Sequence, residues 1–357
     1  MLSPMTEQKT IIVGMSGGVD SSVCAYLLKK QGHRVIGLFM KNWDEVDADG
    51  HCQATKDFAD VVSVCEHIDI PYYSVNFVKE YEENVFSHFL KELKEGHTPN
   101  PDILCNREIK FKVFLEKALS LGADFLATGH YCQISPTYEL LRGNDPSKDQ
   151  SYFLYTLTSS ILKKVLFPIG HLPKTEVRKI AQEAKLPTAR KKDSTGICFI
   201  GKRNFKEFTG KYLGYSPGPF ETLDGKIIGA HDGIAFYTIG QRKGLKIGGP
   251  GDAWFVIDKD PSRNAVILAQ GEDHPSLYRS TLIATDLSWV NGPPPKPPFP
   301  CTAKIRYRAN DTPCVIESIE GGLAFLRFLS PERAITPRQS VVFYSGSVCL
   351  GGGVILK

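Results

Sequence analysis

The chain has 357 residues, of which 42% are hydrophobic, and it carries a formal net charge of +4 at pH 7. That length predicts two or three domains, and that composition is typical of a globular protein with more than one core. No apolar run reaches about 18 residues, which argues against a membrane span. The first ten residues, MLSPMTEQKT, lack the pattern of a targeting segment, so we expect a cytoplasmic protein.

The first half of the chain alternates short apolar runs with helical periodicity, which is typical of a parallel α/β sheet. Strands are predicted over residues 10–14, 34–40, 71–77 and 124–128. Helices are predicted over residues 21–31, 78–94, 107–121 and 173–184. Glycine residues stand where the first three helices should end.

Beyond residue 211 glycines become dense and helical periodicity fades. GIAFYTI (233–239) and AWFVID (253–258) are predicted strands, and NGPPPKPPFP (291–300) is typical of a stiff extended connection. The short strand-like runs that follow favour a small antiparallel barrel. We therefore expect an α/β protein: a doubly wound parallel sheet in residues 1–208, a small β-rich domain in 209–279 and an antiparallel β-barrel in 280–357.

SGGVDSS (16–22) lies between the first predicted strand and helix. Its glycines would let the backbone approach an anion, and the amides that open the helix would point at that anion. No lysine follows, so the P-loop pattern is not met. Asp20 would repel a phosphate unless a cation lay between them, which indicates Mg²⁺. The stretch resembles the PP-loop of ATP pyrophosphatases, although a tight turn with a capping aspartate is the simpler alternative.

Two of the nine cysteines lie in settings that favour thiolate. The odd number and the lack of a CxxC pair argue against a disulfide framework and a structural metal site. Cys105 is predicted at a helix N-terminus, three residues after Asp102, a candidate proton carrier. Cys198 lies in a glycine-containing turn among Lys191, Lys192, Lys202 and Arg203. Both could instead be buried structural residues, or, less favoured, ligands of an iron–sulfur cluster together with Asp102.

An adenylating loop combined with two thiols suits persulfide sulfur transfer, because one thiol can carry the sulfur and the other can release it as a disulfide forms. The chain resembles the tRNA-specific 2-thiouridylase (MnmA/TrmU) family in motifs that run in order from Gly14 to Ile355: GMSGGVDSSV, LFMKNWDE, TPNPDILCNREIKF, ATGHY, KDQSYFLYTL, KKDSTGICFIG, TIGQRKGL and VCLGGGVI.

The resemblance implies ATP-dependent 2-thiolation of the wobble uridine of tRNA. Cys198 would carry the persulfide, Cys105 would free the sulfur by forming a Cys105–Cys198 disulfide, and Asp102 would be the general acid or base. The residues in contact with ATP would be Gly14, Met15, Ser16, Gly17, Gly18, Val19, Asp20, Ser21, Met40 and Gly129. Asn100, Pro101 and Asp102 would meet the target base. The other tRNA contacts would be His130, Lys148, Asp149, Gln150, Arg306, Tyr307 and Gln339.

The resemblance also implies a cysteine desulfurase or a sulfur-relay protein as donor, and we expect a monomer. Two charge patterns fit a polyanionic partner. Residues 163–206 carry twelve basic and three acidic residues, and Lys304, Arg306 and Arg308 would share one face of a strand. Both could be ordinary solvated surfaces. The alternative functions are an amidating PP-loop synthetase acting on a small metabolite and a non-catalytic RNA-binding protein.

Overall fold

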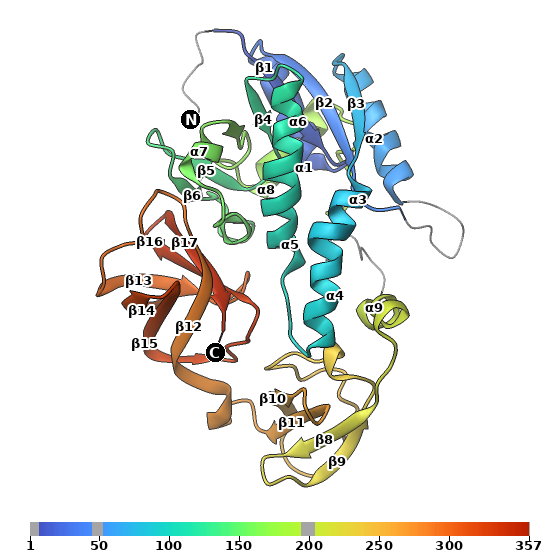
Figure 1. The fold of residues 1–357 in the computed structure, drawn as a ribbon. Helices are drawn as coiled ribbons and strands as arrows, with labels where there is room; N and C mark the ends of the chain where they lie inside the picture. The colour runs from blue at the N-terminus through green and yellow to red at the C-terminus, as the bar shows by residue number, and fades with distance from the viewer. Residues whose placement is uncertain (1–6, 45–52, 194–203, 357) are drawn as a thin grey trace.

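The computed structural model describes residues 7–44, 53–193 and 204–356. Its N-terminal part is built on a five-stranded parallel sheet in the order β3-β2-β1-β4-β7 (Figure 1). Both faces of the central strand are buried, which is why its sequence is a continuous apolar run rather than an alternating one. The strands are β1 (Thr10–Met15), β2 (Arg34–Lys41), β3 (Tyr72–Asn76), β4 (Phe125–Ala127) and β7 (Val165–Leu166).

Helices cover both faces of this sheet, which confirms the predicted doubly wound fold. One face packs Ile11 and Val13 against α1 (Val19–Lys30), α2 (Gln53–His67) and α8 (Lys174–Glu183). The other face packs Ile12 against two long helical segments, each containing a π-helical stretch. The first is α3 (Val78–Tyr81), Glu82–Phe86 and α4 (Ser87–Lys94), and the second is α5 (Pro101–Leu104), Cys105–Val113 and α6 (Phe114–Ser120).

The helix predicted over 107–121 begins earlier than expected, at Pro101. Proline is well suited to a first helical position, because its missing N–H would have no intrahelical partner there. Cys105 therefore lies in the second turn, and its amide donates to the Pro101 and Asp102 carbonyls. The predicted place of Cys105 at a helix N-terminus is wrong, and the dipole argument for its thiolate is lost with it.

Helix α9 (Phe205–Leu213) leads into a central β domain with the strand order β10-β11-β8-β9. Asn204 caps that helix, accepting from the amides of Lys206 and Glu207 at 3.0 and 3.3 Å. The predicted strand GIAFYTI is wrong, because Ile234–Phe236 forms a 3₁₀ turn that begins where His231 accepts the Gly233 amide. The strands are β8 (Gly218–Thr222), β9 (Ile227–His231), β10 (Trp254–Asp260) and β11 (Ala265–Gln270).

Six antiparallel strands close into a barrel through pairing of β12 with β17 (Figure 1). They are β12 (Tyr278–Trp289), β13 (Phe299–Lys304), β14 (Thr312–Glu320), β15 (Leu323–Arg333), β16 (Ser340–Ser345) and β17 (Val348–Ile355). The hairpin of β5 (Cys132–Ile134) and β6 (Leu140–Arg142) extends this sheet from β17, so the N-terminal part contributes strands to the barrel sheet. Within the described residues, no helix is long and apolar enough to cross a membrane.

Strand β13 ends at Lys304, so the predicted alternation of Lys304, Arg306 and Arg308 on one strand face is wrong. Arg306 instead turns inward at the junction between the central β domain and the barrel. Its Nη2 atom lies 2.7 Å from the Ile239 carbonyl, 2.8 Å from the Ala334 carbonyl and 2.8 Å from Thr336 Oγ1. Burial lowers the pKa of Arg306.

Arg306→Ala is expected to lower the free energy of unfolding by about 1–3 kcal/mol, because it removes a donor shared by three buried acceptors, of which the Ala334 carbonyl keeps a hydrogen bond from Thr336 Oγ1. Chemical denaturation of the tRNA-free protein measures the change. Arg308→Ala is the matched control, because that side chain is exposed and its loss should cost less than about 0.5 kcal/mol. Unchanged stability of Arg306→Ala, with only tRNA affinity reduced, would contradict this structural role.

Candidate functional site

The glycine turn after β1 has the geometry of an anion-binding loop. Gly17 has φ +71°, and a Cβ atom there would lie 2.5 Å from the Asp57 carbonyl oxygen, so both conformation and space require glycine. Among the described residues, no side chain caps the N-terminus of α1. The Ser22 hydroxyl donates to the Gly18 carbonyl at 2.8 Å and fixes the turn. The amides that open α1 are therefore positioned to bind phosphate.

Other predicted nucleotide-binding residues lie at the carboxyl ends of neighbouring strands. A Cβ atom on Gly129, just beyond β4, would lie 3.0 Å from the Ser21 amide nitrogen. Gly129 thus packs directly against the start of α1, and a side chain there would cover the amides that a phosphate needs. Met40 lies near the end of β2, which pairs with β1. This edge of a parallel sheet is where α/β proteins form their sites.

The structure brings a lysine to this loop from far along the chain. Lys174, the first residue of α8, places its Nζ 2.7 and 2.9 Å from the two carboxylate oxygens of Asp20. Its Nζ also lies 2.9 Å from Asp193 Oδ1, and the residue is only 9% exposed. Tyr131 donates its hydroxyl to Asp20 at 2.7 Å. Burial and the neighbouring Asp20 raise the pKa of Tyr131, so it remains a donor at neutral pH.

Asp193 joins three cations beside this loop. It lies 2.9 Å from Lys148, 2.9 Å from Lys174 and 2.5 Å from Arg178. Burial opposes ionisation of this carboxyl, but hydrogen bonds from Lys148 and Lys174 outweigh it and lower the pKa of Asp193 to about 2. Part of the positive charge in residues 163–206 is therefore paired within the protein.

Three residues of this site could not be predicted from the sequence: Tyr131, Lys174 and Asp193. Proline at position 173 indicated a helix that begins near Lys174, but helical periodicity does not show which loop the first residue of a helix faces. The partners Asp20 and Lys174 are 154 positions apart. No local pattern signals a contact of that kind.

The remaining predicted site residues have protein partners. The His130 ring packs against the rings of Phe111 and Phe167, and its Nδ1 is 2.7 Å from Thr128 Oγ1. Burial lowers the pKa of His130 well below its ordinary value, which keeps it neutral at pH 7. Buried Asp149 accepts hydrogen bonds from the amides of Gly143 and Ser151, and the Gln150 side chain accepts one from the Tyr131 amide. The ring centroid of Tyr307 lies 4.4 Å from that of Phe153. The Gln339 side chain donates a hydrogen bond to the Thr98 carbonyl. Their tRNA contacts stay predictions.

The predicted thiol pair is described only in part. Asn100, Pro101 and Asp102 form the start of α5, with Asp102 partly exposed, and Cys105 follows at 1% exposure within the main apolar core. Cys198 lies outside the described residues. The geometry of a Cys105–Cys198 disulfide therefore remains a prediction.

Family models match the chain in three consecutive parts. They are described as a tRNA methyl transferase HUP domain (residues 9–202), a tRNA methyl transferase PRC-barrel domain (206–270) and an aminomethyltransferase beta-barrel domain (279–355). A relative named tRNA-specific 2-thiouridylase MnmA, from Protochlamydia amoebophila, is 60% identical across 98% of this chain and 94% of its own length. The chain belongs to the tRNA-specific 2-thiouridylase family.

Another member of that family, from Oceanobacillus iheyensis, is 56% identical over 97% of this chain and 94% of its own length. Two of the domain descriptions say methyl transferase, but the assignment follows relatives that match nearly the whole chain under one name. A solved structure titled U34-tRNA thiolase NcsA from Methanococcus maripaludis, with its [4Fe-4S] cluster, is 20% identical over 58% of this chain and 66% of its own, with a TM-score of 0.38. That likeness is too low to support an argument.

Proposed function

We propose that this protein converts the wobble uridine of tRNA to 2-thiouridine in an ATP-dependent reaction, with the roles given below for its residues. The observation that carries the adenylation step is the glycine turn at the carboxyl end of β1. Gly129 packs against the start of the helix that follows this turn, and Lys174 contacts Asp20 within it. The family relation supports tRNA as the acceptor. The division at residues 208 and 279 has the support of the three family-model ranges.

In the first step the O2 atom of the uridine attacks the α-phosphate of ATP, and pyrophosphate leaves. The amides that open α1 and the Nζ of Lys174 stabilise the negative charge that develops on the phosphates. Asp20 and the hydroxyls of Ser16 and Ser21 are oxygen ligands of the kind that Mg²⁺ prefers, but both carboxylate oxygens of Asp20 already contact Lys174, so a Mg²⁺ that neutralised the phosphates would have to share Asp20 with that lysine. Asp102 acts as general acid or base for the target base.

In the second step the terminal sulfur of a Cys198 persulfide attacks C2 of the adenylated uridine, and AMP leaves with the original oxygen. The intermediate is a disulfide between Cys198 Sγ and the base sulfur. Cys105 thiolate then attacks Cys198 Sγ, which releases 2-thiouridine and leaves a Cys105–Cys198 disulfide. An external thiol must reduce that disulfide before the next cycle, and a cysteine desulfurase or a sulfur-relay protein must reload Cys198.

The proposal is tested by mixing the protein with ATP, Mg²⁺, cysteine, a cysteine desulfurase and an unmodified tRNA transcript. Mass spectrometry of digested nucleosides should find 2-thiouridine, with one AMP formed for each sulfur transferred. AMP release that depends on ammonia and a small carboxylic acid, and that ignores tRNA, would favour an amidating synthetase instead. An activity that requires added iron would favour the iron–sulfur cluster over the persulfide.

Both substrates, tRNA and ATP, are available in the cytoplasm, so we propose that the protein works there.

We also propose that it acts as a monomer, because the two sets of β-strands beyond the parallel sheet give a single chain its own surface for RNA. Light scattering at the concentrations used for the activity assay tests this.

A further inference from the structure

One loop of the N-terminal part is held by side chains from both of the other parts of the molecule. This target-base loop, residues 97–100, joins α4 to the helix that carries Asp102 and Cys105. From the barrel, Gln339 donates to the Thr98 carbonyl at 2.6 Å. From the central β domain, the Nζ of Lys259 lies 3.4 Å from Thr98 Oγ1 and 2.9 Å from the Tyr237 carbonyl.

The central β domain also packs against the turn that opens this loop. Gly96 has φ +77°, and a Cβ atom there would lie 3.2 Å from Pro261 and 3.4 Å from Ile234. Thr98 Oγ1 lies 3.4 Å from Thr238 Oγ1. Burial lowers the pKa of Lys259 to about 8. The oxygens of Thr98 and Tyr237 that its ammonium group contacts carry no charge that would offset this loss of solvation.

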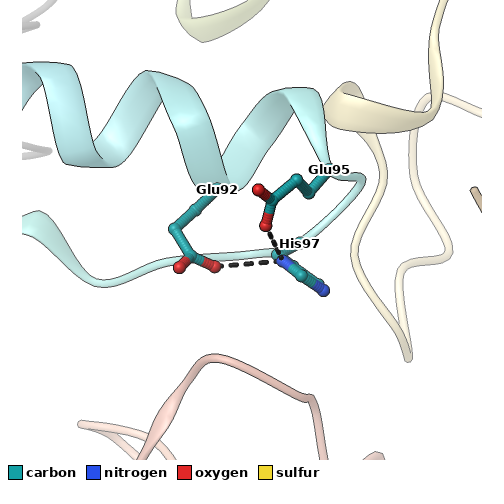
Figure 2. A group of neighbouring side chains, drawn as sticks. All are labelled: Glu92, Glu95 and His97. Atoms are coloured by element: carbon teal, nitrogen blue, oxygen red, sulfur yellow. Dashed lines mark ion pairs between the residues drawn. The ribbon is translucent and has the colours of Figure 1, made fainter.

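The barrel holds the other side of the loop through an ion pair between Arg338 and Glu92. Figure 2 shows Glu92 with its neighbours Glu95 and His97. Glu92, on the last turn of α4, is 4% exposed. Its carboxylate accepts hydrogen bonds from the Nε and Nη2 atoms of Arg338, and the bond from Nε is 2.6 Å long. His97 Nδ1 lies 3.0 Å from Glu92 and 3.5 Å from Glu95. Burial opposes ionisation of Glu92, but the hydrogen bond and charge of Arg338 outweigh it, so the pKa of this carboxyl is lowered.

Glu92, Glu95 and His97 have the spacing of metal ligands. A cation would have to compete with Arg338, which already contacts both carboxylate oxygens of Glu92. The group is therefore better explained as a junction between α4 and the barrel. Glu92 is buried, so removing Arg338 would leave its carboxylate without its main partner, and the contact is strong enough to fix the position of the loop.

We propose that Lys259 and Arg338 are positioning residues for thiolation: they hold the target-base loop so that Asn100 and Asp102 meet the uridine only when the central β domain and the barrel are both seated against it. This inference rests on the proposed function. It makes the two β-rich parts contributors to the chemical step as well as to RNA affinity. A displacement of about 1 Å at such a loop is enough to lower a rate about 100-fold.

The test compares Lys259→Met, Arg338→Met and the near-isosteric Thr98→Val with the wild-type protein. Single-turnover formation of 2-thiouridine, at saturating ATP and tRNA, is expected to fall 10- to 100-fold. The affinities of these variants for ATP and tRNA should stay within about threefold of wild type, because none of the three residues is assigned to a ligand. Lys259→Arg should recover most of the rate, since it keeps a donor at this place. Lys226→Met, exposed on the same β domain, is the control expected to change nothing.

Hydrogen exchange of the peptide that covers residues 96–104 gives a second measurement, which needs no activity. Exchange there should rise in Lys259→Met and Arg338→Met, while the strands of the parallel sheet stay protected. Unchanged exchange and unchanged rates would overturn the proposal, as would a rate loss fully explained by weaker tRNA binding or by general unfolding. A wild-type protein that makes no 2-thiouridine would refute the proposed function, and the exchange result would still decide whether the loop is held.

Discussion

Lys174→Met is expected to lower ATP-dependent AMP formation by at least about 100-fold. Methionine keeps most of the length of the side chain but removes the charge between Asp20 and Asp193, each within 2.9 Å of Nζ. Without that cation, the carboxylates of Asp20 and Asp193 would repel each other and the phosphates of ATP. Loss of one partner from a buried ion pair costs about 3–5 kcal/mol. If the activation barrier rises by that amount, the rate falls by roughly 10²–10⁴.

The measurement is AMP release at saturating tRNA, together with ATP affinity and the unfolding midpoint of each variant. Lys179→Met is the matched control, because Lys179 lies on the same helix but is exposed and only weakly paired, at 3.8 Å from Glu176 and 4.0 Å from Glu183. Lys174→Arg keeps the positive charge, so comparing it with Lys174→Met separates the effect of the lost charge from a folding defect. Wild-type AMP release by a folded Lys174→Met protein would mean that Lys174 only braces the loop.

The parallel sheet could be predicted because its two longest strands, β1 and β2, are largely buried apolar runs that are bounded by turn residues and followed by a helix. The phosphate-binding turn was equally visible, since the glycines and serines that form it are contiguous. The same reasoning failed for GIAFYTI, whose apolar residues are spaced like a strand but pack around a 3₁₀ turn. Periodicity alone cannot separate these outcomes in so short a run.

The contacts that complete the site could not be predicted because they join residues that are distant in sequence. Lys174 meets Asp20, Arg306 meets Ile239, and Arg338 meets Glu92 across 246 positions. Lys174 and Arg306 belonged to charge patterns that could be ordinary solvated surfaces, and Arg338 belonged to no pattern that the sequence analysis singled out. Only the fold reveals an acceptor beside each of them. The start of α5 is a different case, because Asn100 followed by Pro101 is a helix-start signal that the sequence did contain.

Cys105→Ser is expected to abolish turnover, with 2-thiouridine formation lowered at least about 1,000-fold, while the first AMP is still released. Serine is close in size to cysteine, so the buried position should tolerate it, but its hydroxyl cannot attack Cys198 Sγ as a thiolate does. The intermediate that Cys105 should resolve would therefore accumulate. It is a covalent link from Cys198 through a disulfide to the base sulfur of the tRNA.

This adduct can be detected as a protein band that carries tRNA on a denaturing gel without reductant. Dithiothreitol should cleave the disulfide and release tRNA that contains 2-thiouridine. Cys65→Ser is the matched control, because Cys65 is also fully buried and its pKa is raised to about 11 by burial and by Glu66, which makes it a poor nucleophile. Cys198→Ser should give neither adduct nor product. If Cys105→Ser thiolates tRNA repeatedly at the wild-type rate, a small thiol rather than Cys105 resolves the intermediate, and the paired-thiol mechanism is wrong.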